Sequence, residues 1–352
     1  MNTEVVSISD PVLQADEIRR AGDIIRNGGL VVIPTETVYG LGGSATDANA
    51  ARKIYEAKGR PSDNPLIIHV AAPEDAERYA VTSDVYYRLA KAFMPGPLTV
   101  ILPKKDTVPE SVTGGLQTVA VRCPAHPVAR AIIAAAGVAI AAPSANLSGK
   151  PSPTSAEHVI ADLSGRVDMI VDGGASEIGL ESTIVALDGD RAILLRPGAI
   201  TCDALQCVCA SVSVSHAVSE KLKENERPLS PGMKYRHYAP DAPLILLSGE
   251  DSDVLSFLQS EQKKDGGCVI LCYDEEAPFL SSEGLLPVGK KDDLSMQAHT
   301  LFSRLREADR MNARVVYAHL PDKSGLGLAL YNRMIRAAAH TVKEIHKGSA
   351  EG

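Results

Sequence analysis

The sequence predicts an α/β protein with a large mixed sheet in its N-terminal part and a smaller parallel sheet in its C-terminal part. Over the first 200 residues, helical and strand-like segments follow one another without strict alternation, which favours a mixed sheet. From residue 242 onward, strands and helices alternate regularly, as they do in small open parallel sheets. A chain of 352 residues is longer than one typical domain, so we expect two compact units.

The N-terminal part opens with an amphipathic segment, 15–26, that Gly28 and Gly29 close before the apolar run 30–33. This pattern predicts a helix followed by a buried strand. Asp47 is placed to cap a second helix that continues through Lys58. The other predicted helices are 83–93, 127–136 and 155–163, and the other predicted strands are 66–70, 98–102, 118–122, 138–142, 169–171, 183–187 and 192–196. These segments define a first domain over residues 1–205.

The stretch 227–240 reads RPLSPGMKYRHYAP and combines three prolines with basic and aromatic side chains. We interpret residues 206–240 as an ordered linker, because proline and ring-bearing residues stiffen a chain. The segments after it predict strands at 244–247, 268–273 and 315–319 and helices at 254–264, 294–308 and 326–345. They define a small Rossmann-like domain over residues 241–352.

The composition is that of a globular protein and narrows the classes of function. Hydrophobic residues make up 45% and charged residues 23% of the chain, which argues against long disorder, collagen-like sequence and a coiled-coil rod. The formal net charge of -8 disfavours extended binding to nucleic-acid phosphates. The N-terminus MNTEVVSISD lacks the features of a secretory signal, and no run of 18 apolar residues occurs. We therefore expect a cytoplasmic protein without a membrane segment.

The six cysteines are too sparse for a disulfide framework. Three lie in apolar, strand-like runs and are interpreted as buried thiols: Cys123, Cys268 and Cys272. A second group raises the alternative of a metal site: Cys202, Cys207 and Cys209. Because this group offers three ligands without a CxxC pair or a nearby histidine, a structural role is favoured.

Two glycine motifs resemble nucleotide-binding loops but depart from them. Residues 284–291 read GLLPVGKK, which places Lys291 where a phosphate loop needs the serine or threonine that holds magnesium. Gly325 and Gly327 lack the third glycine of a dinucleotide fingerprint and are expected to start a helix. Any nucleotide site must therefore be built differently.

Three segments place polar side chains next to predicted strands or helices. Residues 34–43, PTETVYGLGG, leave a strand as a glycine-rich loop, Lys58 and Arg60 follow a helix, and Ser144 and Asn146 follow the strand 138–142. A glycine-rich loop lets a ligand approach the backbone, a Lys/Arg pair suits phosphate or bicarbonate oxygens, and ligands of α/β proteins commonly bind at strand carboxyl ends. Taken singly, each segment is also compatible with a plain connection, a helix C-terminus or a turn.

Together these segments resemble the threonylcarbamoyl-AMP synthase family, whose YrdC-like catalytic domain carries a KxR…SxN signature. Here the signature residues are Lys58, Arg60, Ser144 and Asn146. The resemblance spans residues 15–200 and includes PTETVYGLG, KGRP, MPGPLT, AVRCP, APSAN, SGKPSPT, GLEST and LRPG. The segment SPGMKYRHYAP and the C-terminal unit resemble the longer, two-domain version of the family. The likeness therefore covers nearly the whole chain.

The resemblance implies an enzyme that converts L-threonine, bicarbonate and ATP to threonylcarbamoyl-AMP and pyrophosphate, the activated group for threonylcarbamoyladenosine in tRNA. It implies two stages, in which the amine of threonine captures carbon dioxide and the resulting carbamate attacks the α-phosphorus of ATP. Positioning and fixed positive charge then carry the catalysis without a nucleophilic side chain. Mg²⁺ is expected to accompany ATP, and no tightly bound organic cofactor is expected.

The resemblance also implies roles for individual residues. The catalytic residues would be Lys58, Arg60, Ser144 and Asn146; threonine would lie against Thr35, His69, Arg122, Ala142 and Ser182; ATP would contact Arg60, Asn64, Thr118, Ser144, Ser152, Arg196 and Ser230. No metal-binding residue is assigned. Without the resemblance, His69 is equally compatible with a core histidine at a strand end.

The linker carries Lys234, Arg236 and His237, and we hypothesise that it closes over the active site as a lid that keeps a labile carbamate and adenylate from water. A downstream tRNA threonylcarbamoyl transferase complex is a candidate partner, whereas stable binding to nucleic acid or a membrane is not expected. One rival interpretation is a non-catalytic RNA-binding or ribosome-assembly protein, which the net charge disfavours. The other is a carbamoyl-transfer maturation enzyme, which would be expected to carry zinc-type cysteine pairs.

Overall fold

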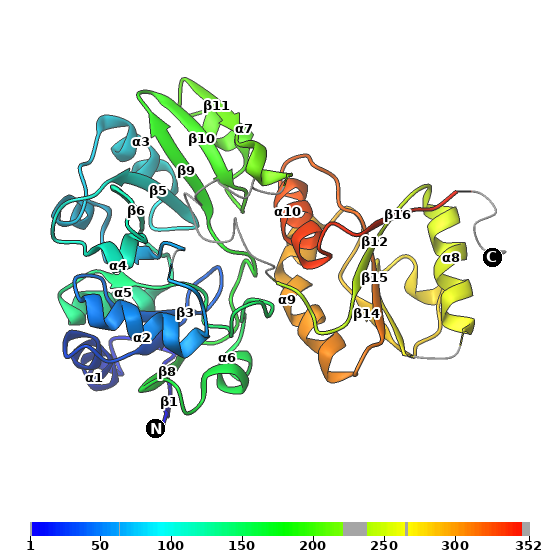
Figure 1. Ribbon diagram of the computed structural model, residues 1–352, viewed down its shortest axis with the longest axis horizontal. Coiled ribbons are helices and arrows are strands. Elements are labelled where there is room, and N and C mark those ends of the chain that lie inside the picture. Colours follow the sequence, from blue (N-terminus) through cyan, green and yellow to red (C-terminus); the bar gives the residue numbers. More distant parts are fainter. Residues whose placement is uncertain (1, 63, 221–237, 265–266, 347–352) are drawn as a thin grey trace. The chain divides into compact units, whose positions relative to one another are not determined.

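The computed structural model describes residues 2–62, 64–220, 238–264 and 267–346, which divide into two compact units (Figure 1). The first unit holds residues 2–148 and 152–220, and the second holds residues 149–151 and 238–346. Residues 149–151 therefore belong to the second unit although they lie in the first half of the sequence. About half of the expected linker, residues 221–237, lies outside the described residues, so the linker and the lid stay predictions.

The first unit is built on a mixed sheet. Its strands are β1 (Glu4–Ser7), β2 (Val31–Ile33), β3 (Gly40–Ser44), β4 (Ile67–His69), β5 (Leu98–Pro103), β6 (Thr118–Arg122), β7 (Ile140–Ala141), β8 (Met169–Asp172), β9 (Thr183–Asp188), β10 (Arg191–Arg196) and β11 (Ser211–Val214). The described strands are ordered β1-β8-β2-β3-β7-β4-β6-β5-β9-β10-β11. β4 and β6 run parallel, whereas β5 and β6 run antiparallel. The predicted mixed sheet is confirmed.

Helices cover this sheet and support the strand ends. They are α1 (Ala15–Arg26), α2 (Ala48–Lys58), α3 (Asp84–Phe93), α4 (Glu110–Thr113), α5 (Pro127–Ala136), α6 (Ala156–Leu163) and α7 (Cys202–Gln206), with short 3₁₀ turns at Pro73–Arg78 and His216–Val218. As predicted, Asp47 caps α2, because its carboxylate accepts a hydrogen bond of 2.7 Å from the Asn49 backbone N–H. α1 and α5 share a core with β2 and β7 that includes Ile18, Ile132 and Val31.

The glycine-rich segment predicted as a loop continues as strand β3, which is a correction to the sequence prediction. β3 pairs antiparallel with both β2 and β7. A Cβ added at Gly42 would lie 2.7 Å from Ile140 Cγ2 and 3.0 Å from the Val31 carbonyl oxygen. Because glycine has no side chain, the strand can approach its neighbours this closely. Strands β1 and β11 also lie outside the predicted set, and β11 pairs with β10 at residues expected to begin the linker.

The second unit is a small parallel sheet, as predicted. Its elements are β12 (Leu244–Ser248), α8 (Asp251–Lys263), β13 (Cys268–Cys272), β14 (Leu285–Pro287), α9 (Leu294–Arg310), β15 (Val315–His319), α10 (Gly327–Ala337) and β16 (Val342–Glu344), with a 3₁₀ turn at Ala277–Phe279. The described strands are ordered β14-β13-β15-β12-β16, and every pair is parallel. Figure 1 shows α8 on one face of this sheet and α9 and α10 on the other.

The last helix is shorter than the predicted range 326–345. α10 ends at Ala337, and Ala339 and His340 have φ angles of 49° and 66°. Left-handed backbone cannot continue a right-handed helix. The chain then forms β16, which pairs in parallel with β12.

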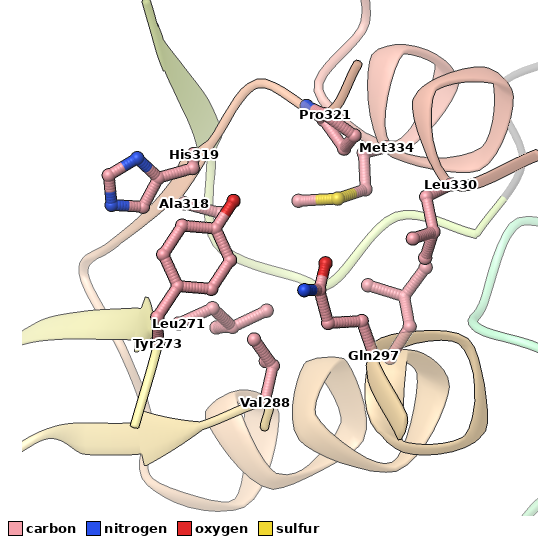
Figure 2. A pocket seen from close by; sticks show the side chains of 10 residues that line it. Leu271, Tyr273, Val288, Gln297, Ala318, His319, Pro321, Leu330 and Met334 are labelled. Carbon is pink, nitrogen blue, oxygen red and sulfur yellow. The ribbon is translucent and has the colours of Figure 1, made fainter. Parts of the chain in front are cut away.

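A small hollow lies at the carboxyl ends of β13 and β15 (Figure 2). Tyr273 follows β13, His319 ends β15, and Gln297 of α9 and Met334 of α10 line the opposite side. The rings of Tyr273 and His319 stack with centroids 4.6 Å apart, and His319 Nε2 lies 2.8 Å from Glu276 Oε1. These contacts hold the loop after β13 against the end of β15.

The structure also tests the predictions made for the glycine motifs and the cysteines. Residues 285–287 of the GLLPVGKK segment form strand β14, which is incompatible with a phosphate loop, and Gly327 begins α10 as predicted. Cys123 and Cys272 are buried as predicted, whereas Cys268 is only partly buried. Within residues 2–62, 64–220, 238–264 and 267–346, no group of three or more His, Cys, Asp or Glu side chains is placed to hold a metal ion. In the same part of the chain, no helix combines the length and the apolar character needed to cross a bilayer.

Candidate active site

A row of buried side chains crosses the sheet of the first unit. His69 ends β4 and Arg122 ends β6, and the two residues are paired in register on these parallel strands. Thr99 of β5 lies directly opposite Arg122. Paired residues on neighbouring strands project to the same face of a sheet. The three residues, which are 3%, 4% and 0% exposed, therefore form one row, so His69 and Arg122 are brought together.

Hydrogen bonds extend this row to Ser182 and Arg196. The hydroxyls of Thr99 and Ser182 share a hydrogen bond of 2.7 Å. Arg196, the last residue of β10, donates from Nε to the Ser182 carbonyl oxygen at 3.0 Å and from Nη2 to the Ser182 hydroxyl at 3.1 Å. A residue expected to bind threonine and one expected to bind ATP are therefore in direct contact.

Arg122 forms a buried ion pair with Glu36, which follows Thr35 in the PTETVYG segment. Glu36 Oε1 lies 2.8 Å from Arg122 Nη2, and the two side chains are 7% and 5% exposed. Burial by itself would raise the pKa of Glu36, but the charge of Arg122 and its hydrogen bond outweigh burial and leave this pKa below its ordinary value. Glu36 is therefore ionised at neutral pH, and the pair carries no net charge.

His69 is held in its neutral form. Burial, together with the nearby positive charge of Arg122, lowers the pKa of His69 to about 3. Its Nδ1 atom is buried and has no hydrogen-bond partner among the described residues. A neutral imidazole has one donor and one acceptor nitrogen, so this atom is available to a polar ligand.

Lys58 joins the two halves of the KxR…SxN signature. This residue ends α2 and is 3% exposed. Its Nζ donates to the carbonyl oxygens of Ser144 and Asn146, both at 2.5 Å, and to Asn146 Oδ1 at 3.3 Å. The Ser144 hydroxyl in turn donates to Asn146 Oδ1 at 2.5 Å. Lys58 therefore positions the segment 144–146, a role beyond the charge that the sequence predicted for it.

The PTETVYG segment contacts two other motifs of the sequence, APSAN and SGKPSPT. Tyr39 donates from its backbone N–H to the Pro153 carbonyl oxygen at 2.9 Å, and its own carbonyl oxygen accepts from the Ala145 backbone N–H at 2.8 Å. Within the segment, the Thr35 hydroxyl donates to the Val38 carbonyl oxygen at 2.6 Å. These contacts bring Thr35 into the same region as the residues after β7.

The residues expected to bind ATP include Arg60, Asn64 and Thr118. Arg60 donates from Nη2 to the Asn64 carbonyl oxygen at 3.1 Å. Asn64 is fully buried, and neither polar atom of its side-chain amide has a hydrogen-bond partner in the described part of the chain. Thr118 begins β6, so it lies about 13 Å along the strand from Arg122. The described contacts do not join Thr118 to the row that Arg122 occupies.

The remaining predicted residues are placed as follows. The Ala142 backbone N–H donates to the carbonyl oxygen of Ile67 in β4 at 2.9 Å. Ser152 is buried, and its hydroxyl donates to Glu181 Oε1. Ser230 and the linker residues Lys234, Arg236 and His237 lie outside the described residues.

Comparison with known proteins identifies the family. Residues 23–198 match the family described as Telomere recombination, and residues 200–339 match the family described as Threonylcarbamoyl-AMP synthase, C-terminal domain. The threonylcarbamoyl-AMP synthase of Bacillus subtilis (strain 168) is 43% identical over 97% of this chain and 96% of its own length. This chain belongs to the threonylcarbamoyl-AMP synthase family.

Other members of the threonylcarbamoyl-AMP synthase family show the same two-domain extent. The threonylcarbamoyl-AMP synthase of Pyrococcus abyssi (strain GE5 / Orsay) is 43% identical over 94% of this chain and 96% of its own length. The crystal structure of P. abyssi Sua5 complexed with L-threonine matches this fold with a TM-score of 0.88 at 40% identity, over 98% of this chain and 100% of that chain. The resemblance drawn from the sequence motifs is therefore confirmed.

The buried polar residues of this threonylcarbamoyl-AMP synthase family member that lie outside the set predicted from sequence include three that contact predicted site residues. They are Glu36, Thr99 and Glu181. Glu36 lies inside PTETVYGLG and directly follows Thr35, and Glu181 lies inside GLEST and directly precedes Ser182, so each carboxylate adjoins a residue predicted to bind threonine. Acidic residues are almost never fully buried unless they are paired. A carboxylate next to a predicted ligand-binding residue is the sequence signal that could have found the two glutamates.

Proposed function

We propose that this chain converts L-threonine, bicarbonate and ATP to threonylcarbamoyl-AMP, pyrophosphate and water, and so supplies the activated group for threonylcarbamoyladenosine in tRNA. One observation carries the proposal beyond family membership. Glu36 Oε2, His69 Nδ1 and both polar atoms of the Asn64 amide are buried without a hydrogen-bond partner among the described residues. Buried polar groups nearly always have partners. Polar substrates would supply the missing ones.

In this proposal the row on the sheet binds threonine. Arg122 binds the carboxylate, because a guanidinium matches carboxylate geometry. The neutral ring of His69 and the Ser182 hydroxyl are suited to hydrogen-bond the hydroxyl of threonine. The amine then attacks carbon dioxide released from bicarbonate with loss of water, so that an N–C bond forms and the amine loses a proton. Holding both reactants in one buried site supplies much of the rate by proximity.

The second stage joins the carbamate to the adenylate. A carbamate oxygen attacks the α-phosphorus of ATP, and the bond from that phosphorus to the bridging oxygen breaks to release pyrophosphate. Negative charge develops on the transferred group, so fixed cations stabilise the transition state. Lys58, Arg60 and Arg196 are the cations that we propose for this task. Lys58 also keeps Ser144 and Asn146 in place through the contacts of its ammonium group.

Magnesium is proposed to enter with the phosphates of ATP. The described residues contain no cluster of carboxylates or histidines that fits a metal ion. Hard cations beside a nucleotide usually need few protein ligands. We therefore assign no protein residue to the ion.

We propose the linker lid, a cytoplasmic location and delivery of the adenylate to a tRNA threonylcarbamoyl transferase as further parts of this function. The support is chemical, because a carbamate and a mixed anhydride both hydrolyse if water reaches them. The net charge of -8 speaks against stable binding of tRNA by this chain.

The deciding assay is pyrophosphate release from ATP, measured with both co-substrates and with threonine or bicarbonate left out in turn. We expect release only when threonine and bicarbonate are both present, together with threonylcarbamoyl-AMP detected by mass spectrometry. Release that does not depend on threonine would contradict the proposal. No release under any condition would favour a non-catalytic binding protein.

A further inference from the structure

The Glu36–Arg122 pair is incompletely satisfied on both sides. Arg122 Nη2 lies 2.8 Å from Glu36 Oε1, and Arg122 Nε makes a long hydrogen bond of 3.4 Å to the Gly96 carbonyl oxygen. Within the described part of the chain, Arg122 Nη2 has no partner besides this ion pair, and Glu36 Oε2 has no hydrogen-bond partner. The pair therefore offers one unused cationic donor and one unused anionic acceptor side by side.

The charges around this pair balance. His69 is neutral, because burial and Arg122 lower its pKa to about 3, and the neighbouring Thr99 and Ser182 carry uncharged hydroxyls that bond to each other. Beside Ser182 lie one buried residue of each sign, Glu181 and Arg196. The Glu36–Arg122 pair thus has no net charge, although its opposite charges are separated in space.

A buried site without net charge favours ligands in which opposite charges are also separated. An amino acid at neutral pH is such a ligand, since it carries one carboxylate and one ammonium group. A plain carboxylate would bring a net negative charge into a site of low polarity, where an uncompensated charge is costly. If Glu36 lost its charge, Arg122 would become an unbalanced cation, and that preference would reverse.

We infer that Glu36 is a positioning and specificity-determining residue of the threonine subsite. It holds the Arg122 guanidinium in place and keeps the subsite neutral, so that the subsite takes an amino-acid zwitterion in preference to a plain carboxylate. This inference rests on the proposed function, because it takes threonine as the ligand of the row. It differs from a purely structural role, in which Glu36 only neutralises Arg122 for folding and binding of all ligands would weaken alike.

The test is isothermal titration calorimetry of the full chain without ATP, with two ligands. One is L-threonine, and the other is 3-hydroxybutanoate, which is threonine without its amino group. We compare the wild type with Glu36→Gln, which keeps the size of the side chain and removes its charge. The matched control is Glu276→Gln, which removes a buried carboxylate beside His319 in the second unit.

The wild type and Glu276→Gln are expected to bind L-threonine more tightly than 3-hydroxybutanoate. In Glu36→Gln, the affinity for L-threonine should fall about tenfold or more, the typical effect of losing a charge-assisted contact. The affinity of this variant for 3-hydroxybutanoate should rise. Glu36→Asp, which keeps the charge on a shorter side chain, should bind threonine less tightly but retain the preference for the zwitterion.

Two results overturn the inference. Unchanged threonine affinity in Glu36→Gln would show that the carboxylate does not matter for the subsite. An equal loss of both ligands, with no change in preference, would show a structural role only, and Glu36→Asp decides the question if Glu36→Gln does not fold. The outcome is separate from the fate of the proposed function, which fails if the wild type makes no threonylcarbamoyl-AMP even when the calorimetric preferences are as expected.

Discussion

The Lys58 side chain connects the end of α2 to Ser144 and Asn146 of the candidate site. An ammonium group has three donors, and here it donates to the carbonyl oxygens of Ser144 and Asn146 and to Asn146 Oδ1. Removing such a buried cation leaves polar acceptors without their partner, which is costly. The consequence is both a loss of charge and a loss of order in the segment that follows β7.

We predict that Lys58→Met lowers kcat for pyrophosphate release by about a hundredfold or more, since a fixed charge that stabilises a transition state is typically worth that much. Initial rates with saturating ATP, threonine and bicarbonate test this. Lys53→Met is the control, because the Lys53 ammonium donates to the Gly28 carbonyl oxygen at the surface. A Lys58→Met enzyme with the rate of the control would refute the role given to Lys58.

A second residue-scale prediction concerns His69 and pH. Its pKa is lowered in the folded protein to about 3, whereas an unfolded histidine titrates near pH 6.5. Between these pH values the unfolded chain binds a proton at His69 that the folded chain does not bind. The contribution of neutral His69 to the free energy of unfolding is therefore fully present above pH 6.5 and falls on acidification, by up to about 1.4 kcal/mol per pH unit. His69→Asn should flatten this dependence between pH 7 and pH 5.

Urea unfolding at both pH values measures the effect. The exposed His346 supplies the control, since His346→Asn should leave the slope of stability against pH as it is in the wild type. If His69→Asn and the wild type lose the same stability on acidification, the buried neutral form of His69 is not responsible for the dependence.

At the scale of the element, β3 shows why a strand escaped prediction. Glycine is depleted in strands, and the run Gly40–Ser44 contains three glycines, so its sequence indicates a loop. In the fold, β3 is sandwiched between β2 and β7. Glycine occurs in this strand because neighbouring atoms lie too close to leave room for a larger side chain, and not because glycine favours strands.

We predict that Gly42→Ala destabilises the protein by about 1–3 kcal/mol through overpacking. A Cβ at this position would meet Ile140 Cγ2 at 2.7 Å. Gly43→Ala is the matched comparison in the same strand, because its nearest atoms are flexible side-chain carbons at 3.2 Å, and its cost should be smaller. Chemical denaturation of both variants tests the order, and an equal or reversed cost would contradict the packing explanation.

At the scale of the whole molecule, each unit has a hydrophobic core of its own. Ile25 and Ile132 belong to a core of the first unit, and Leu258 and Ile270 belong to the core of the second. Neither core contains residues of the other unit. Because the two cores share no residues, we expect each unit to unfold locally without the other.

We predict that Leu258→Ala, at a fully buried position, destabilises the second unit by about 2–5 kcal/mol. Hydrogen exchange followed by mass spectrometry should then be faster in peptides from residues 242–346 and unchanged in peptides from β2 and α1. Ile25→Ala is the reciprocal variant and should act on the first unit alone. Faster exchange throughout the chain in either variant would mean that the two cores unfold together.

The sequence by itself determined the long, periodic elements, since α1, α2, α5 and β6 follow directly from spacing, capping residues and apolar runs. It also determined the family, because motifs such as PTETVYGLG and APSAN are local. Short elements were decided otherwise: β16 has three residues, and β3 is mostly glycine, so neither carries a periodic signal.

Only the tertiary structure decided which polar groups meet. Glu36 and Arg122 are 86 residues apart in the sequence, yet their side chains lie 2.8 Å apart. Lys58 reaches Asn146 over a separation of 88 residues. Strand order and register set these contacts, and both depend on the burial of whole faces rather than on any local pattern. The sequence therefore proposed the site residues, whereas the fold showed the contacts among them, including the ion pair between Glu36 and Arg122.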